Sequence, residues 1–324
     1  MKEKIRTYAY SLGFDIVGFA RREDLGFRQD SFFKIQAKKT FGDMEYLHSF
    51  DKRHARVLSE LPECRSVIVV GINSFQTPTQ PGADESNVPS GRIARYAWGK
   101  DYHRVLKHKL ERLASHMETL FPGSQSKICV DTEAILEKPL AVKAGLGFQG
   151  KNTLLINRTF GTWLLLGELL TTIQIEPDKS REVRDEGCGT CRACIDACPT
   201  GALPGDYTMR ADLCLSYHTI ESKGPIPEAI QIKMGDRLFG CDICAEVCPH
   251  NRKVAPSSHP ELKGSGRTGE RLSFAFVEAI PSGRAYQKLF EGTPLKRLGL
   301  KRLKRNVRAL ETGRKHFSQM GEGT

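Results

Sequence analysis

The spacing of apolar residues predicts a mixed α/β unit over the first 175 residues. Apolar positions at helical spacing predict helices over residues 1–12 and 101–121. Short apolar or β-branched runs predict strands over residues 15–20, 65–73, 127–130, 154–157 and 163–173. Residues 76–91 hold Pro, Gly, Ser and Asn, which are typical of a loop. The sequence has no regular alternation of strands with helices and no repeat of fixed period, so neither a regular βαβ fold nor a repeat array is indicated.

The pattern changes near residue 180. Residues 180–253 are rich in cysteine, and residues 254–270, rich in Pro, Ser, Gly and charge, are predicted to form a surface linker. The last segment has helical spacing, with one apolar face formed by Leu300, Leu303, Val307 and Leu310 and with basic residues elsewhere at Lys301, Arg302, Lys304, Arg305 and Arg308. Three segments are therefore expected: 1–178, 179–253 and 254–324.

Composition places the chain among globular proteins of the cytoplasm. Its 324 residues suffice for two domains or one large one, and 39% hydrophobic and 27% charged residues are ordinary values for such proteins. The first residues are charged, without the apolar stretch of a signal peptide. The longest apolar run, residues 162–170, is too short for a membrane span and contains Glu168. We therefore expect a cytoplasmic protein without a membrane segment.

Eight of the ten cysteines lie between residues 188 and 248. In a cytosolic chain, clustered cysteines hold metal or do redox chemistry more often than they form disulfides. The two outside this stretch, Cys64 and Cys129, are expected to be small buried apolar residues.

The spacing of the eight clustered cysteines predicts two 4Fe–4S clusters. The first run is Cys188-x2-Cys191-x2-Cys194-x3-Cys198-Pro, which is the bacterial ferredoxin pattern, and the second is Cys241-x2-Cys244-x3-Cys248-Pro. The second run lacks one cysteine, which Cys214 can supply. Because the fourth cysteine of such a run binds the other cluster, we expect one cluster on Cys188, Cys191, Cys194 and Cys248 and the other on Cys198, Cys214, Cys241 and Cys244. Two zinc sites are the alternative, but three cysteines in a row followed by x3-Cys-Pro do not fit paired zinc-ribbon units.

A glycine-rich segment imitates nucleotide-binding motifs without their context. Residues 145–150 spell G-x-G-x-x-G, but a predicted helix precedes them and a strand follows, the reverse of a dinucleotide site. A P-loop would need Ser or Thr where Asn152 stands. The segment is therefore interpreted as a turn where backbone can approach a large ligand closely.

Two polar residues are candidates for chemistry. His103 lies in Asp-Tyr-His, similar to a cobalt-binding motif of corrinoid proteins, but Leu106 replaces the required glycine. We therefore expect His103 to be a packed or hydrogen-bonded helix residue. Asp131 follows a strand, so it is either a helix N-cap or a general acid whose pKa is raised by a partly apolar pocket. The sequence leaves both readings of Asp131 open.

Together these stretches resemble the epoxyqueuosine reductase family, from about residue 1 to 253 and more weakly through the basic tail. The matching segments are Arg95-Tyr-Ala-Trp-Gly-Lys-Asp-Tyr-His103, Val130-Asp-Thr-Glu133, Ala144-Gly-Leu-Gly-Phe-Gln-Gly-Lys-Asn152, the first cysteine run with Pro-Thr-Gly-Ala-Leu203, and Gly240-Cys-Asp-Ile-Cys-Ala-Glu-Val-Cys-Pro249. The resemblance implies an α/β (α+β) fold: a nitroreductase-like cobalamin-binding domain, a ferredoxin-like two-cluster module and a short basic helical tail. Some members end in HEAT-type helical repeats, and this chain has room for about one such helix.

The resemblance also implies an activity, cofactors and partners. The family reduces epoxyqueuosine to queuosine at the wobble position of tRNA, using cobalamin that is reduced through two 4Fe–4S clusters. Cobalamin is expected base-off, without a protein histidine on cobalt. The implied partners are a tRNA with a GUN anticodon and a one-electron donor such as ferredoxin or flavodoxin, and the protein is expected to be a monomer.

Site residues carry over by position. Asp131 matches the family's proton donor. The positions that line the corrin are Arg53, Ala94, Leu155 and Leu166, with Thr219 and Asp242 near the cluster-facing edge.

Two other functions fit part of the sequence: a reductive dehalogenase-like corrinoid enzyme acting on a small molecule, and an electron-transfer protein without its own substrate. The net charge of +11 and the basic tail favour a polyanionic partner whose phosphates the tail would hold. The alternative for the tail is a solvated helix face.

Overall fold

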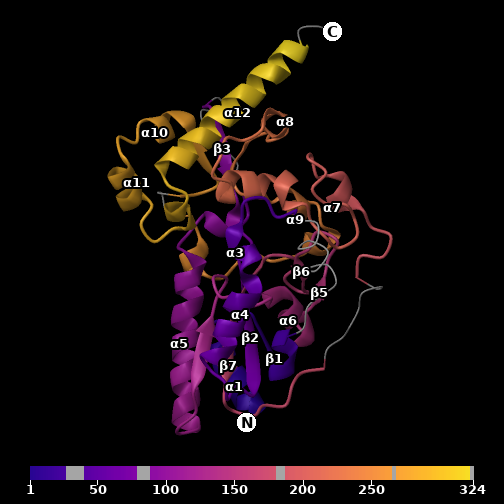
Figure 1. Cartoon of the computed structure of the whole chain (residues 1–324), viewed down its shortest axis with the longest axis vertical. Helices are drawn as coiled ribbons and strands as arrows, with labels where there is room; N and C mark the ends of the chain where they lie inside the picture. The colour runs from indigo at the N-terminus through magenta and orange to yellow at the C-terminus, as the bar shows by residue number, and fades with distance from the viewer. Residues whose placement is uncertain (27–39, 79–87, 180–186, 265–267, 322–324) are drawn as a thin grey trace.

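The computed structural model describes residues 1–26, 40–78, 88–179, 187–264 and 268–321, and Figure 1 gives their arrangement. The N-terminus lies at the end of the molecule that holds the larger sheet, and helix α12 (Leu300–Gly321) runs to the opposite end. No helix among the described residues is long and apolar enough to cross a membrane.

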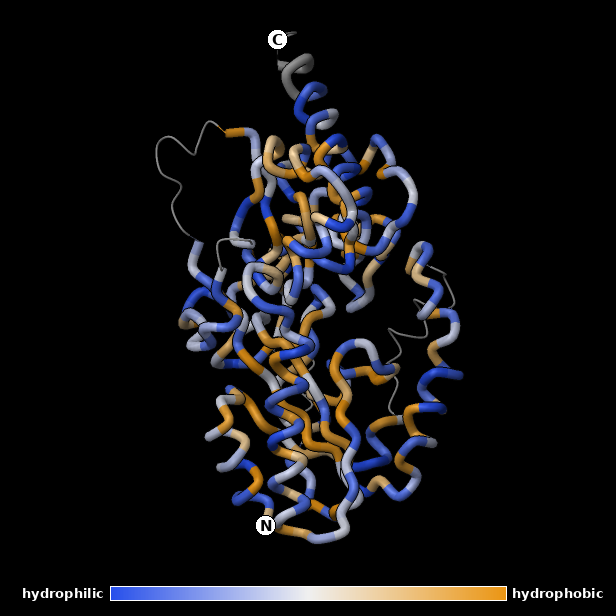
Figure 2. The backbone as a smooth tube through the Cα atoms, turned by 90° about the vertical axis from the view of Figure 1, so that its left-hand side faces the viewer, coloured by the Kyte–Doolittle hydropathy of each residue, from blue (hydrophilic) through white to orange (hydrophobic). Residues whose placement is uncertain are grey.

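The larger sheet has four antiparallel strands in the order β1-β2-β7-β4. They are β1 (Ile16–Arg21), β2 (Ser66–Asn73), β7 (Leu164–Thr171) and β4 (Ser126–Cys129). All four lie where apolar runs predicted strands, and Figure 2 shows hydrophobic backbone gathered in this part of the molecule. Glu168 of β7 lies opposite both Val69 and Cys129, so a carboxyl group stands in the centre of the sheet.

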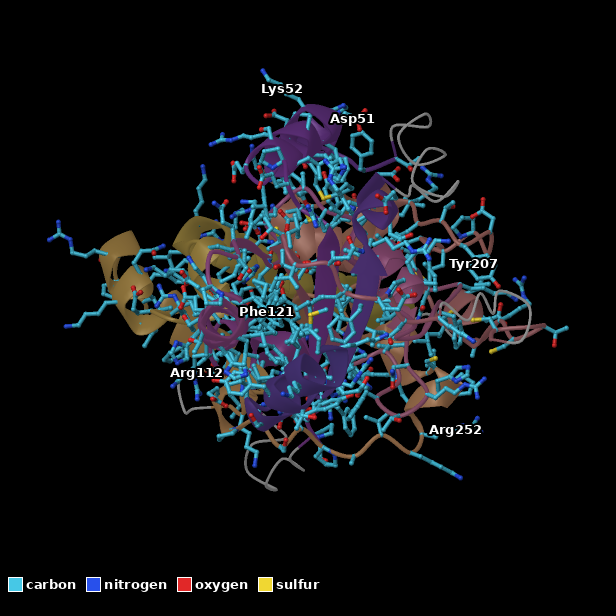
Figure 3. The ribbon with its side chains drawn as sticks, turned by 90° about the horizontal axis from the view of Figure 1, so that it is seen from below. Asp51, Lys52, Arg112, Phe121, Tyr207 and Arg252 are labelled. Carbon is cyan, nitrogen blue, oxygen red and sulfur yellow. The ribbon has the colours of Figure 1, made fainter. Side chains whose placement is uncertain are left out.

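Helices cover both faces of this sheet. Alternate residues of β2 point to opposite sides, so Ile68 packs with α1 (Lys2–Ser11) and α5 (Tyr102–Leu120). Val67 and Val69 pack on the other side with α4 (Phe50–Ser59) and α6 (Glu137–Lys143). In Figure 3 Lys52 points outward from α4, so the polar face of this helix meets solvent. The predicted helices 1–12 and 101–121 are confirmed.

A second sheet joins three distant parts of the chain. Strand β3 (Ser90–Ile93) pairs in parallel with β8 (Arg237–Phe239) and antiparallel with β9 (Arg271–Ser273). Helix α12 packs over β8 with its apolar face, and Leu303, Val307 and Leu310 are buried there. The loop predicted over 76–91 therefore ends in a strand, and its residues 79–87 lie outside the described ones.

The predicted surface linker over 254–270 is only partly exposed in its described residues. Val254, His259 and Leu262 are buried, and His259 Nε2 lies 2.7 Å from Asp15 Oδ2. Proline, serine and glycine correctly indicate turns here. The apolar and imidazole side chains between those turns nevertheless pack against the N-terminal unit, which composition does not reveal.

The other elements are short. They are α3 (Glu45–His48), β5 (Phe148–Gln149), β6 (Leu155–Ile156), α7 (Ala193–Asp196), α8 (Glu228–Gln231), α9 (Ile243–Glu246), α10 (Phe274–Glu278) and α11 (Gly283–Leu289). A π-helical turn spans Tyr217–Glu221, and a 3-10 turn spans Pro294–Arg297. The 3-10 turns of the remaining described chain are Arg22–Gly26, Arg95–Ala97, Ala211–Leu213, Pro249–Asn251 and Pro260–Leu262. The mixed α/β character predicted from the sequence is confirmed.

Candidate active site

A cavity of about 790 Å³ lies where the three sequence segments meet. One wall comes from the start of α5 and from Asp131 and Thr132, and another from residues 287–297. The π-helical turn contributes Ser216, Ile220 and Glu221 to the lining. The cavity thus touches the N-terminal unit, the cysteine-rich segment and the C-terminal segment at once.

His103 lies between two carboxylates in this cavity. Asp101 caps α5, and its side chain accepts a hydrogen bond from the His103 main-chain nitrogen. The Nδ1 atom of His103 lies 2.6 Å from Asp101 Oδ1, and Nε2 lies 2.9 Å from Asp131 Oδ2. The expectation of a hydrogen-bonded helix histidine is confirmed.

The backbone sets the position of Asp131. This residue has φ of +54°, and its main-chain nitrogen donates a hydrogen bond of 2.6 Å to Glu137 Oε1. The N-cap of the next helix, α6, is Leu136, so the N-cap interpretation of Asp131 is wrong. A strained left-handed residue held at a cavity is more typical of a functional site than of a simple turn.

The proton in this group resides on the histidine. Burial alone would lower the pKa of His103, but hydrogen bonds to Asp101 and Asp131 and their charges raise it to about 9. Burial would raise the pKa of Asp131, but the hydrogen bond and charge of His103 outweigh it and lower the pKa. The prediction that the pKa of Asp131 is raised is therefore wrong, because its closest partner is a cation.

Sequence reasoning did not identify Glu137. Burial, followed by the charge of Asp131, raises the pKa of Glu137 to about 8, so this acid holds its proton near neutral pH. Its position six residues after Asp131 carries no motif. The turn between β4 and α6 brings the two together.

The residues predicted to line a corrin fall into three groups. In the first, Arg53 lines the cavity with Asp131, and its Nη2 donates a hydrogen bond of 2.6 Å to the Thr132 carbonyl. Arg53 and Asp131 are therefore brought together as expected.

The second group surrounds Gly240. Ala94 and Asp242 line a small cavity that Cys241 also lines. The Thr219 hydroxyl accepts a hydrogen bond of 3.0 Å from the Gly240 nitrogen. A Cβ atom on Gly240 would lie 2.6 Å from the Cβ of Ala94, so glycine permits this close approach.

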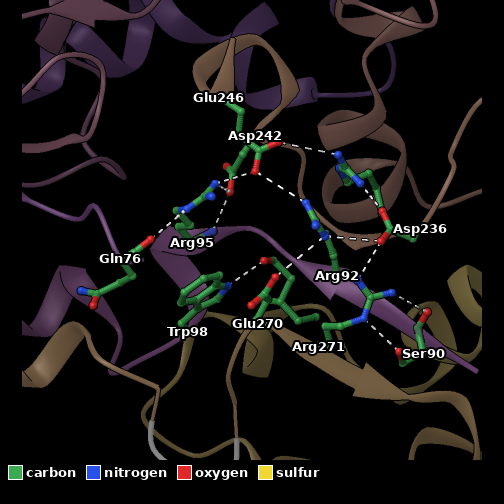
Figure 4. Close-up of polar contacts among 12 residues, drawn as sticks. Gln76, Ser90, Arg92, Arg95, Trp98, Asp236, Asp242, Glu246, Glu270 and Arg271 are labelled. Atoms are coloured by element: carbon green, nitrogen blue, oxygen red, sulfur yellow. Dashed lines mark hydrogen bonds and ion pairs between the residues drawn. The ribbon is translucent and has the colours of Figure 1, made fainter. Parts of the chain in front are cut away.

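A charged network holds the second group in place. The Arg95 nitrogen donates a hydrogen bond of 2.8 Å to Asp242 Oδ2, and Arg95 Nη1 lies 2.7 Å from Glu246 Oε1. Figure 4 shows Arg95 and Arg92 facing Asp242 and Glu246, with Asp236 beyond. This network ties the start of the second cysteine run to the segment after β3.

The third group lies in the core. Leu155 of β6 and Leu166 of β7 are buried together on the α4 and α6 side of the larger sheet. They line neither of the two cavities above. The structure therefore does not bring these two leucines together with Asp131 at one cavity.

None of the eight clustered cysteines, all of which the structure describes, forms a disulfide, and the charges that act among them define two neighbourhoods. Burial raises the pKa of Cys194, and so do the charges of Cys188, Cys248 and Cys191. Burial also raises the pKa of Cys214, with a contribution from Cys198. Cys244 has a raised pKa through burial and then mainly through the charges of Cys241 and Cys214. Burial and mutual repulsion disfavour the thiolate forms of these cysteines, so a cationic metal centre would be needed to hold them deprotonated.

Part of the basic tail does structural work. Arg305 donates hydrogen bonds to the carbonyls of His218, Ser222 and Gly224, at 2.6–2.7 Å. Arg302 donates one of 2.8 Å to the Ile220 carbonyl. Arg302 and Arg305 were expected to bind tRNA phosphates. This expectation is corrected, because their guanidinium groups bind main-chain carbonyls and hold α12 against the π-helical turn.

Comparisons with known proteins agree on one family. Residues 55–132 match the model "Epoxyqueuosine reductase QueG, DUF1730", and residues 187–251 match a 4Fe-4S double cluster binding domain. Epoxyqueuosine reductase from Prochlorococcus marinus (strain NATL2A) is 38% identical over 271 residues, covering 82% of this chain and 83% of that protein. The Escherichia coli (strain K12) enzyme is 35% identical over 314 residues, covering 95% and 79%.

Solved structures lead to the same family. Epoxyqueuosine reductase from Streptococcus thermophilus superimposes with a TM-score of 0.82 at 30% identity, covering 97% of this chain and 81% of that one. An epoxyqueuosine reductase crystallised with an epoxyqueuosine-modified tRNA-Tyr stem loop superimposes with a TM-score of 0.80 at 29% identity, covering 95% and 80%. Reductive dehalogenases are only distant structural neighbours. The chain belongs to the epoxyqueuosine reductase family, and it contains a double 4Fe–4S cluster domain.

Proposed function

We propose that this protein reduces epoxyqueuosine to queuosine in the anticodon loop of tRNA, with electrons that pass through two 4Fe–4S clusters to cobalamin. One observation carries the proposal. Protonated His103 is hydrogen-bonded to Asp131, and both residues line a cavity that residues of the cysteine-rich segment also line. A proton source therefore faces a cavity that the cysteine-rich segment borders, and the clusters of that segment would supply the electrons. The relative that was crystallised with a modified stem loop supports a tRNA substrate.

The cluster ligands follow the two neighbourhoods of thiols. Cys188, Cys191, Cys194 and Cys248 would hold one cluster, and Cys198, Cys214, Cys241 and Cys244 the other. Cys244 is also influenced by the charge of Cys194, so the two groups adjoin. Two adjoining clusters suit stepwise transfer of single electrons, and a one-electron donor such as ferredoxin or flavodoxin would supply them.

Four of the six residues expected to line the corrin, Arg53, Ala94, Thr219 and Asp242, fit a cobalamin between the clusters and Asp131, whereas Leu155 and Leu166 lie apart in the core. Tyr96 lines the main cavity. Burial raises the pKa of Tyr96, the charge of Arg297 lowers it, and the charges of Asp242 and Asp131 raise it further, so Tyr96 lies within reach of both carboxylates. Tyr96 also approaches the Gly240 position, where Ala94 and Thr219 lie. Ala94, Thr219 and Asp242 would thus hold the cluster-facing side of the cofactor, and Arg53 and Asp131 the substrate-facing side. When bound, cobalamin supplies a strongly reducing centre that delivers electrons to carbon.

The protein's own residues supply the first proton to the departing oxygen, and the second comes from solvent. Removing an epoxide oxygen to leave an alkene consumes two electrons and two protons, and the oxygen leaves as water. Asp101 accepts from Nδ1 of the His103 imidazolium, while Nε2 holds the proton that faces Asp131. Asp131 Oδ2 can pass this proton to the oxygen as the carbon–oxygen bond opens, which avoids a free alkoxide.

The test is an anaerobic assay with protein that contains both clusters, cobalamin, a chemical reductant and tRNA carrying epoxyqueuosine. Nucleosides from the digested tRNA are identified by mass spectrometry. We expect queuosine to appear only when cobalamin is present. No conversion by protein with verified clusters and cobalamin would reject this substrate, and turnover of a halogenated small molecule would then favour a dehalogenase-like activity.

A further inference from the structure

The outer wall of the cavity carries cations that the sequence did not single out. Arg104 of α5 and Lys296 and Arg297 of the Pro294–Arg297 turn line it. Their side chains are 66%, 36% and 59% exposed, so all three reach solvent at the mouth. We call these three residues the cationic rim.

The rim residues form ion pairs with carboxylates, and a phosphate can replace these partners. Glu291 lies 3.4 Å from Arg104 Nη2 and 2.5 Å from Lys296 Nζ, and Glu221 pairs with Arg297. The exposed ion pairs of Glu291 stabilise the folded protein only weakly. A phosphodiester can replace such a carboxylate at little cost, and arginine binds phosphate oxygens through two N–H groups.

The shape of the site places a polynucleotide backbone at this rim. An anticodon base that reaches Asp131 must leave the loop and enter the cavity, while its flanking phosphates stay outside. Arg104 of α5 and Lys296 of the C-terminal turn lie together at Glu291, and Arg297 follows Lys296, so the rim joins α5 to that turn at one part of the cavity lining. On α12, by contrast, Arg302 and Arg305 already bind main-chain carbonyls.

We propose that Arg104, Lys296 and Arg297 form a phosphate-binding rim that binds the anticodon-loop backbone next to the modified nucleotide. This inference rests on the proposed function. It assigns RNA binding to a turn in the C-terminal segment and to the first turn of α5, not to the exposed basic face of α12. Ion pairs with Glu291 and Glu221 keep the rim in position when no RNA is bound.

The test measures binding of an anticodon stem loop to the cluster-containing protein by fluorescence anisotropy at several salt concentrations. The rim variants are Arg104→Gln, Lys296→Gln and Arg297→Gln, singly and combined. The slope of log affinity against log salt is negative, and each lost phosphate contact on single-stranded RNA reduces its magnitude by about 0.7. The magnitude should therefore fall by about 2 in the triple variant. KM for the stem loop should rise in the rim variants.

Two sets of control variants decide the outcome. Arg112→Gln removes the same charge from the exposed face of α5 outside the cavity lining, and should leave affinity and slope unchanged. Lys301→Gln with Arg308→Gln removes exposed charge from α12. Unchanged binding by the triple rim variant, or an equal loss from the α12 pair, would overturn the rim. If the parent protein binds the stem loop but forms no queuosine, the proposed function fails while the rim is still judged by affinity.

Discussion

Replacing Asp101 by asparagine tests where the active-site proton resides. The Asp101 side chain accepts from His103 at both the main-chain nitrogen, at 3.1 Å, and Nδ1, at 2.6 Å. Asparagine is an equally good N-cap and its amide oxygen can still accept from Nδ1. The substitution therefore removes one negative charge while keeping both the helix start and the orientation of the imidazole.

The size of the effect follows from the His103 environment. Two carboxylates raise the pKa of His103 from 6.5 to about 9, which corresponds to about 3 kcal/mol in favour of the imidazolium. Loss of one carboxylate should remove roughly half of this energy and bring the pKa of His103 to about 8. At pH 9 about half of the parent protein but only about a tenth of the variant would hold the proton, which is roughly a fivefold difference in rate.

The assay is single-turnover queuosine formation with excess protein, measured anaerobically from about pH 7 to pH 10. The rate should stay level while His103 is protonated and fall as pH rises through its pKa. Because removing a negative neighbour lowers that pKa, Asp101→Asn should lose activity at lower pH than the parent. Glu118→Gln removes one charge from the far end of α5 and should not move the profile. An alkaline limb that stays in place in Asp101→Asn would refute a proton stored on His103.

Three more predictions follow from the same geometry. Asp131→Asn should retain cobalamin binding, measured by absorbance, but lower the single-turnover rate by about 10²–10⁴-fold, and a near-normal rate would exclude proton transfer through Asp131. Burial raises the pKa of Glu168 well above its usual value, and its carboxylate oxygens have no hydrogen-bond partner among the described residues. The parent protein should therefore lose stability as pH rises above about 4.3, the pKa of an exposed glutamate. Glu168→Gln should therefore raise the apparent Tm more at pH 8 than at pH 5, and an identical pH dependence of Tm would contradict this account. Cys214→Ser should lower iron from roughly eight to roughly four atoms per chain and leave one cluster signal in electron paramagnetic resonance spectra, whereas full iron content would contradict the ligand assignment.

Local sequence pattern was sufficient to predict where the strands of the larger sheet and the long helices lie in the chain. β2 and α5 have apolar residues at their own periods, and burial on one face or both is a property of a single segment. The cysteine runs also carry their chemistry in their spacing, and the double cluster domain over 187–251 agrees with it. These features depend on residues that are close in the sequence.

The cavity depends on contacts that no local pattern contains. Asp131 and His103 are 28 residues apart in the N-terminal unit, and Arg297 comes from the C-terminal segment, yet all three line one cavity. The direction of the shift in the pKa of Asp131 was predicted wrongly for the same reason. The apolar neighbours of Asp131 are adjacent in the sequence, whereas the His103 imidazolium 2.9 Å away is not. The α12 arginines were assigned to RNA because a basic helix has the same pattern whether its cations bind phosphates or carbonyls.

The most direct test of the account is a single turnover with the reduced, cobalamin-loaded protein and a limiting amount of stem loop carrying epoxyqueuosine. Oxidation of the cofactor is followed by absorbance, and queuosine is quantified by mass spectrometry in the same samples. The account predicts one queuosine for every two electrons lost, with both signals rising at the same rate and both slowed in Asp131→Asn. Queuosine formed at the parent rate without cobalamin, or cofactor oxidation unrelated to queuosine, would contradict it.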